Sequence, residues 1–147
     1  MWASRRDEPG FGGHSHCPKD GGVSGSPANP LQIVRATRLV NGAGEVLLER
    51  CWIADRPWAR MRGLLGRSGL DQGEGLLLKP CGSVHTLFMG FPIDVVFLDR
   101  ELSVVAVRPE VPPWRTAGAR GAKVTLELAA GEAGRLGIEP GMRFRLA

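Results

Sequence analysis

The part of the chain richest in chemically active side chains runs from Cys81 to Asp94. Its mostly apolar positions hold a thiol, an imidazole, a hydroxyl, a thioether and a carboxylate, on Cys81, His85, Thr86, Met89 and Asp94. Polar groups in an apolar strand need hydrogen-bond partners. We therefore expect Asp94 to accept hydrogen bonds from His85, Thr86 or a backbone turn.

Three interpretations of this segment stay open. In the first, Asp94 fixes the turn from Met89 to Pro92, and His85 is an interior histidine whose hydrogen bonds are satisfied. In the second, these side chains contact a ligand. In the third, Cys81 is a nucleophilic thiolate, His85 is its general base and Asp94 orients the imidazole, as in a thiol hydrolase. No nucleophile-elbow motif surrounds Cys81 to bring the thiol and the imidazole together.

A second group of metal-ligating side chains lies near the N-terminus, at His14, His16 and Cys17. Neither this tract nor the segment described above has a complete ligand set for zinc. The three cysteines of the chain are about 30 residues apart, a spacing typical neither of a disulfide framework nor of a CxxC zinc site. We expect free thiols, no metal and no cofactor.

The charge and hydropathy patterns argue against two classes of protein. The net charge is +4, and residues 1–30 are neutral, so the remainder of the chain carries the excess. A short amphipathic helix around Trp58, rather than a nucleic-acid interface, accounts for four nearby arginines, Arg56, Arg60, Arg62 and Arg67. No apolar run approaches the roughly 20 residues that span a bilayer, and no signal-peptide pattern is present. We predict a cytoplasmic protein without a transmembrane segment or a nucleic-acid partner.

The elements that must position the candidate residues are short strands. Residues 1–30 are rich in Gly, Pro and Ser and are predicted to be disordered, which leaves residues 31–147 as a single domain. Asn41 and Gly42 predict the turn of a first hairpin. Alternating or continuous apolar residues predict further strands at 76–78, 93–98, 104–107, 124–128 and 142–146. The strands at 93–98 and 104–107 are predicted to form a central hairpin.

Two short helices complete the prediction. One runs from Asp55 through Leu65, and the other from Ala130 to Leu136 with Gly137 as its C-cap. Many short strands, few helices and many Gly and Pro turns favour a mainly β (α+β) fold. We predict a compact antiparallel β-barrel-like domain with two short helices.

A loop of about ten residues follows Pro109, which is long for a compact domain. Such loops often carry function. Beside two consecutive prolines it holds Trp114 and Arg115, which either form a rim that stacks on a ligand or close the end of the barrel.

Five groups of residues, taken in order, resemble the uncharacterised DUF192 family. They are residues 60–66 (RMRGLLG), 73–78 (GEGLLL), 85–99 (HTLFMGFPIDVVFLD), Pro113 with Trp114, and 126–141. The resemblance covers residues 31–147 and implies a compact β-barrel-like α+β domain with no established activity or cofactor. His85, Thr86, Met89, Pro92 and Asp94 match the family signature, whereas a thiol at Cys81 is not a consistent part of it. Many relatives carry an export leader, a pattern not seen here.

The sequence supports two hypotheses of different classes. The first is a non-enzymatic module that binds a small ligand, a peptide end or a partner strand in an apolar recess. Its ligand-binding residues are predicted to be His85, Thr86, Met89, Asp94, Trp114 and Arg115. The alternative is a thiol-dependent or acid-base hydrolase that uses Cys81, His85 and Asp94 and requires an exposed thiol of lowered pKa. No pattern in the sequence indicates the oligomeric state.

Overall fold

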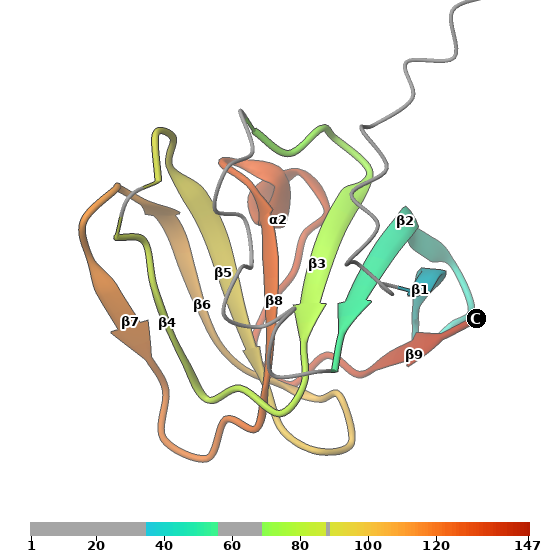
Figure 1. Ribbon diagram of the computed structural model, residues 1–147. Helices are drawn as coiled ribbons and strands as arrows, with labels where there is room; N and C mark the ends of the chain where they lie inside the picture. The colour runs from blue at the N-terminus through green and yellow to red at the C-terminus, as the bar shows by residue number, and fades with distance from the viewer. Residues whose placement is uncertain (1–34, 56–68, 88) are drawn as a thin grey trace, which may run out of the picture.

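The computed structural model describes residues 35–55, 69–87 and 89–147 (Figure 1). The predicted disordered tail and nearly all of the helix predicted after Asp55 lie outside these residues. The elements are β1 (Arg35–Asn41), β2 (Val46–Ala54), β3 (Glu74–Leu78), β4 (Ser83–His85), β5 (Ile93–Leu98), β6 (Val104–Val111), β7 (Thr116–Gly118), β8 (Val124–Ala129), α2 (Glu132–Arg135) and β9 (Phe144–Leu146).

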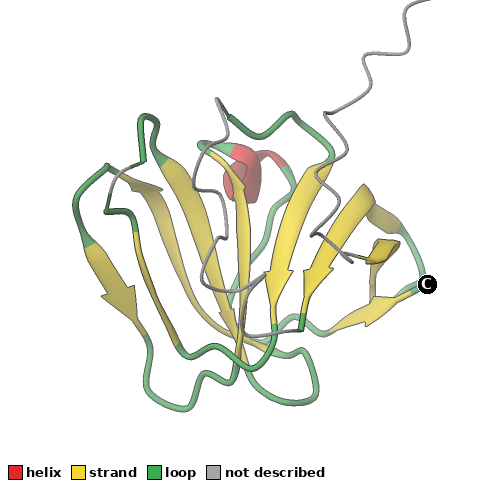
Figure 2. Ribbon diagram, viewed as in Figure 1, coloured by secondary structure: helices red, strands yellow, loops and turns green. Residues whose placement is uncertain are grey.

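The fold is mostly β, as predicted, and most of its strands belong to one curled sheet that forms a half-barrel (Figure 2). The strand order is β6-β5-β8-β3-β2-β1-β9, and β4 and β7 form a separate two-stranded sheet. One pair departs from the predicted antiparallel arrangement, because β2 and β3 run parallel. Periodicity reports which residues are buried in each strand and says nothing about strand direction. The intervening 55–73 segment is long enough for the crossover that a parallel pair requires.

The hairpin of β5 and β6 was predicted to be central, and this is only half correct. β5 lies inside the sheet between β6 and β8, whereas β6 is an edge strand. β6 approaches the opposite edge only at its start, where Ser103 forms a bridge with Arg143 and the N–H of Val104 donates to the carbonyl of Met142 (2.7 Å). The half-barrel is therefore joined at one end and open along the rest of β6.

Both faces of the central strands are buried. Every residue of β5 is buried, as its continuous apolar run predicted. One face packs with α2 in a cluster that includes Leu39, Leu48, Val96, Leu126, Ala133 and Phe144. The other face packs with the two-stranded sheet in a cluster that includes Leu76, Leu78, Val84, Ile93, Val95 and Phe97. The sheet thus separates two hydrophobic cores.

The loop predicted after Pro109 contains secondary structure. β6 continues through Pro109 to Val111, and β7 pairs antiparallel with β4 so that His85 lies opposite Thr116. A proline can occupy β6 because an edge strand needs hydrogen bonds on one side only. β4 and β7 have three residues each, which is too short for periodicity to reveal them.

α2 shows the predicted cap and is shorter than predicted. The N–H of Gly137 donates to the carbonyl of Gly134 (3.1 Å), and the N–H of Ile138 donates to the carbonyl of Ala133 (2.9 Å). Gly137 has a φ of 63°, so these contacts form a Schellman motif with glycine at its left-handed position. In the part of the chain that the structure describes, no helix has the length and apolar character needed to cross a membrane.

β8 contains a buried acid. Alternation along the strand puts Thr125 and Glu127 on one face. The second core covers that face and leaves Glu127 only 4% exposed between Leu76 and Val95. Oε2 of Glu127 and Nε1 of Trp52 are buried and make no hydrogen bond, the two such side-chain atoms among the described residues. Burial disfavours the charged carboxylate and raises the pKa of Glu127 to about 7.

We expect Glu127 to make stability depend on pH. Because its folded pKa lies above the unfolded value of 4.5, its contribution is fully present below about pH 4.5 and is lost as the pH rises through 7. A rise in pKa from 4.5 to about 7 corresponds to about 3 kcal/mol of folding stability. Urea denaturation of wild type and Glu127→Gln from pH 4.5 to 8 should show that wild type loses stability relative to the variant as the pH rises, by an amount of this order. The exposed Glu139→Gln provides the control, and a constant difference for Glu127→Gln contradicts the raised pKa.

Candidate functional site

Thr86 holds the connection between β6 and β7 in place through hydrogen bonds. It is buried directly after β4, and its backbone N–H donates to the carbonyl of Arg115 (2.7 Å). Its hydroxyl donates to the carbonyl of Pro112 (2.7 Å) and accepts the N–H of Arg115 (2.8 Å). Its carbonyl accepts the N–H of Trp114 (2.9 Å). One residue thus holds both ends of the 112–115 loop.

Asp94 holds the end of β6 in the same way. Its side chain is 0% exposed, and its Oδ1 accepts the N–H groups of Glu110 (2.8 Å) and Gly131 (3.1 Å). Its Oδ2 accepts the N–H of Ala133 (2.9 Å). Hydrogen bonds to the ionised form are what make a buried carboxylate tolerable. Asp94 therefore joins β5, the end of β6 and the start of α2.

The two residues anchored in this way have a backbone conformation that side chains rarely adopt. Glu110 has a φ of 49° and Trp114 a φ of 63°. Residues other than glycine hold such positions only when the surroundings determine them, and these positions cluster at functional sites. The segment from 110 to 114 is therefore a strained bend supported by the two buried residues Asp94 and Thr86.

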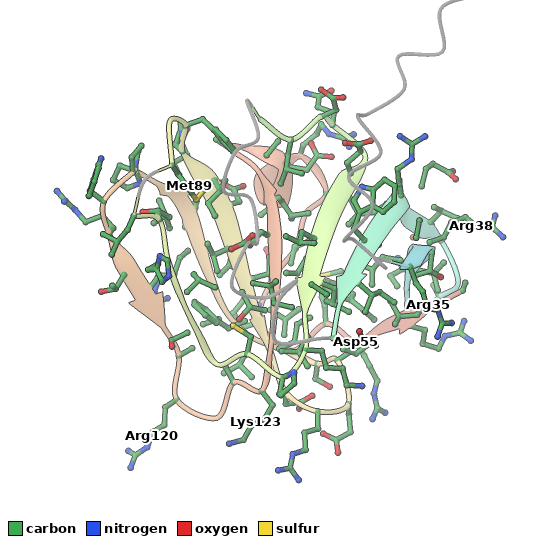
Figure 3. The ribbon with its side chains drawn as sticks, viewed as in Figure 1. Arg35, Arg38, Asp55, Met89, Arg120 and Lys123 are labelled. Atoms are coloured by element: carbon green, nitrogen blue, oxygen red, sulfur yellow. The ribbon has the colours of Figure 1, made fainter. Side chains whose placement is uncertain are left out.

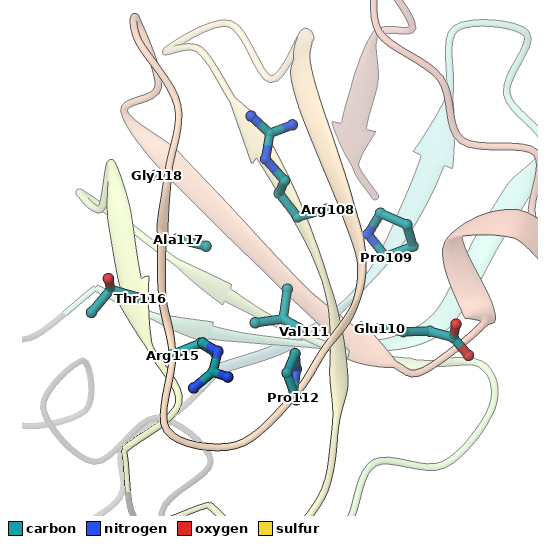
Figure 4. Close-up of a pocket in the computed structure, with 9 residues that line it drawn as sticks. All are labelled: Arg108, Pro109, Glu110, Val111, Pro112, Arg115, Thr116, Ala117 and Gly118. Carbon is teal, nitrogen blue, oxygen red and sulfur yellow. The ribbon is translucent and has the colours of Figure 1, made fainter.

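A pocket of about 430 Å³ opens above this bend. It is lined by residues 108–112 on the β6 side and 115–118 on the β7 side. Figure 4 shows Val111 and Ala117 pointing into the space between the two segments, whereas Glu110 and Thr116 point away from it. The pocket therefore has an apolar centre.

Three charged residues line this pocket, of which Glu110 points away from its centre and the other two are arginines. Nη1 of Arg108 donates to the carbonyl of Val107 (3.3 Å), and Nη1 of Arg115 donates to the carbonyl of Trp114 (3.2 Å). The ion pairs among the described residues lie elsewhere, between Arg50 and Glu74 and between Arg135 and Glu132. Neither pocket arginine thus has a carboxylate partner in the described part of the chain.

The six residues predicted to bind a ligand take different places around the pocket. Arg115 lines it, and Thr86 and Asp94 support its wall from the core. Met89 is buried in the second core, and Trp114 is 56% exposed on the bend. His85 is exposed on β4, so the prediction of an interior histidine is wrong. Strand alternation explains this, because the neighbouring Val84 fills the core and turns His85 outward.

The three residues of the hydrolase alternative have separate contacts. Both carboxylate oxygens of Asp94 accept backbone N–H groups, and neither accepts a hydrogen bond from His85. The expected donors to Asp94 were His85, Thr86 or a backbone turn, and the observed donors are the backbone N–H groups of residues 110, 131 and 133. Sγ of Cys81 donates to the carbonyl of Ser83 (3.0 Å).

Candidate metal ligands do not gather in the described residues, where no group of three His, Cys, Asp or Glu side chains could hold an ion. The N-terminal tract of His14, His16 and Cys17 lies outside them. Cys51 and Cys81 are free thiols, and burial raises the pKa of Cys51 to about 12. Cys51 is therefore a core residue without thiolate character at neutral pH.

Sequence reasoning missed Arg108 as a pocket residue. It appears in the sequence as the first charge after the run from Val104 to Val107, followed at once by Pro109. A charge and a proline at the end of an apolar run are typical of an edge strand, which is the signal that was available.

The contacts of Asp94 make its substitution by asparagine costly. The asparagine side chain has one acceptor oxygen and would turn an N–H₂ group toward a backbone donor, so at least one buried N–H loses its partner. We expect Asp94→Asn to lower the free energy of unfolding by about 1 to 3 kcal/mol. Hydrogen exchange should speed up at the amides of Glu110, Gly131 and Ala133. Asp71→Asn, at an exposed position before β3, is a surface comparison, and unchanged exchange at the three amides would show that Asp94 does not anchor them.

Thr86 allows a sharper test, because valine has the same shape without the hydroxyl. Thr86→Val leaves the carbonyl of Pro112 and the N–H of Arg115 without their partner and should destabilise the protein by about 1 to 3 kcal/mol. Thr86→Ser keeps the hydroxyl and should retain these two hydrogen bonds. Amide exchange at residues 114–116 distinguishes the variants, and equal exchange in both contradicts the anchoring role.

Comparisons with known proteins find one family and two similar crystal structures. The DUF192 family, described as an uncharacterized ACR, matches residues 39–146. No curated protein matches the chain. A protein of unknown function from Novosphingobium aromaticivorans has a similar crystal structure, with a TM-score of 0.67, 23% identity and coverage of 82% of this chain and 89% of that one.

A second similar crystal structure, from Sinorhizobium meliloti, is of a protein provisionally named a transcription regulator. Its TM-score is 0.66 at 23% identity, and the match covers 77% of this chain and 93% of that one. At such identity the two structures show a common fold. The match over residues 39–146 covers most of the chain, which therefore belongs to the DUF192 family.

Proposed function

We propose that this protein is a non-enzymatic binding module that takes an anionic ligand into the pocket between β6 and β7. The observation that carries the proposal is the pair of arginines, Arg108 and Arg115, which line one pocket and have no carboxylate partner among the described residues. Guanidinium groups match carboxylate and phosphate oxygens through two parallel hydrogen bonds. The apolar centre at Val111 and Ala117 suits the carbon atoms of the same ligand.

The way the pocket is held supports this proposal. Binding is tighter when the site already has its bound shape, because less conformational entropy is lost. The hydrogen bonds of Thr86 and Asp94 hold the strained bend before any ligand arrives. The proposal therefore assigns Arg115 a contact with the ligand and Thr86 and Asp94 a positioning role.

The other residues predicted from the sequence take lesser parts. Trp114 flanks the pocket on the bend, and Met89 fills the core beneath the small sheet. His85 lies opposite Thr116, whose side chain points away from the pocket. No catalytic role is assigned to Cys81, because its Sγ donates a hydrogen bond to the carbonyl of Ser83 and Asp94 accepts backbone N–H groups in place of an imidazole.

Thermal unfolding tests the proposal with small anions as probes. Wild type is titrated with acetate, succinate, citrate and inorganic phosphate at constant ionic strength, because simple screening also changes stability. A ligand at ten times its Kd stabilises the folded state by about 1.4 kcal/mol, which raises the Tm of a domain of this size by roughly 5 °C. We expect at least one of these anions to produce such a shift.

Two arginine variants show where the anion binds. Arg115→Gln should remove the shift, and Arg120→Gln, on the exposed loop after β7, should keep it (Figure 3). Without ligand, both variants should melt within about 2 °C of wild type, because both side chains are exposed. Equal shifts in the two variants place the anion elsewhere on the surface and contradict the proposal, as does the absence of any shift in wild type.

A further inference from the structure

β6 and β7 are consecutive strands joined by a short bend, yet they do not pair with each other. β6 is the edge of the large sheet with β5 as its neighbour, and β7 pairs with β4 in the small sheet. Most consecutive antiparallel strands with so short a connection form a hairpin. Here the pocket lies between residues 108–112 and residues 115–118 and is lined by both segments (Figure 4).

We propose that an extended peptide inserts between β6 and β7 and adds to the free edge of β6, with its terminal carboxylate bound by Arg115. This inference rests on the proposed function and identifies the anion as the C-terminus of a polypeptide. An edge strand has no neighbour on one side, so its backbone can pair with another strand. Along the pocket Pro109 and Pro112 have no N–H and the N–H of Glu110 is held by Asp94, so the peptide supplies N–H groups to the carbonyls of β6. A peptide in this position lies between the large sheet and the small one.

The two arginines give the peptide a direction. Figure 4 shows Arg115 beside Pro112, where the bend closes the pocket, and Arg108 further along β6. A carboxylate at the closed end thus meets Arg115, and the chain leaves along β6 past Arg108. Arg108 is three positions before Val111, so at about 3.3 Å per residue it reaches a side chain about three residues before the peptide's end. An acidic residue there completes the charge match.

β6 is also protected against unselective pairing. Pro109 removes one N–H from its edge, and the exposed Arg108 repels basic strands. Val111 and Ala117 point into the pocket from the β6 side and the β7 side and leave room for an apolar side chain next to the terminal carboxylate. The chemistry at the pocket therefore fits a peptide that ends in an apolar residue with a free carboxylate and has Asp or Glu about three residues earlier.

Affinity selection from a peptide library tests this inference. The full chain is immobilised and presented with random acetylated hexapeptides, once with free C-terminal carboxylates and once with C-terminal amides, and bound peptides are identified by mass spectrometry. We expect the free acids to be enriched, with Asp or Glu preferred upstream. Neither the Arg108→Gln, Arg115→Gln double variant nor the amidated library should show this enrichment, whereas Arg120→Gln should behave like wild type.

The selected peptide then distinguishes strand addition from capture of a carboxylate alone. Methylation of alternate backbone nitrogens, placed to face β6, should weaken binding at least about tenfold if the peptide forms strand hydrogen bonds. Amide exchange should slow in β6 and β7 when the peptide binds. Binding that is insensitive to backbone methylation, or that leaves both strands unprotected, overturns the inference.

Failure of the inference is separable from failure of the proposed function. If succinate or phosphate shifts the Tm in an Arg115-dependent way and the library yields no enriched free acid, the pocket binds small anions and the peptide is rejected. If neither the anions nor the library depend on Arg115, both proposals are rejected. Matching unliganded melting temperatures of wild type and the double variant show that the comparison concerns binding and not folding.

Discussion

The carboxylate of Asp94 is the constraint on which the arrangement of the domain depends. A buried carboxylate without partners is too costly for a protein interior, so β5 can occupy the centre of the fold only with three backbone N–H groups delivered to this side chain. Those donors come from the end of β6 and the start of α2. Their convergence fixes where the edge strand bends and where the helix begins, and the unusual backbone of Glu110 follows from it.

Local pattern was enough to predict part of this structure. The continuous apolar run of β5, the turn after β1 and the glycine that ends α2 each depend on neighbours within a few residues, and all were predicted. The donors to Asp94 lie 16, 37 and 39 positions away, and the parallel partner of β2 lies beyond the 55–73 segment. Periodicity carries no information about such distant partners, and the burial of Glu127 escaped prediction because another sheet covers its face.

The candidate site shows a related division between supporting and exposed groups. The residues that stand out in the sequence, Thr86 and Asp94, are polar groups in apolar surroundings, and the structure uses both to hold a bend from the inside. The pocket itself presents exposed arginines of a type found on any protein surface. Their significance comes from the space between β6 and β7 and from the fact that neither forms an ion pair among the described residues. Neither feature can be read from the sequence alone.

The pairing of β1 with β9 affects how the protein folds during its synthesis on the ribosome. Arg38 and Ala147 exchange backbone hydrogen bonds (3.1 and 2.9 Å), so β1 meets its outer partner only after all the intervening strands have been made. Until then the nascent chain exposes β1 as an edge to which another unfinished chain can pair. The time taken to synthesise the residues between β1 and β9 therefore sets how long this edge stays uncovered.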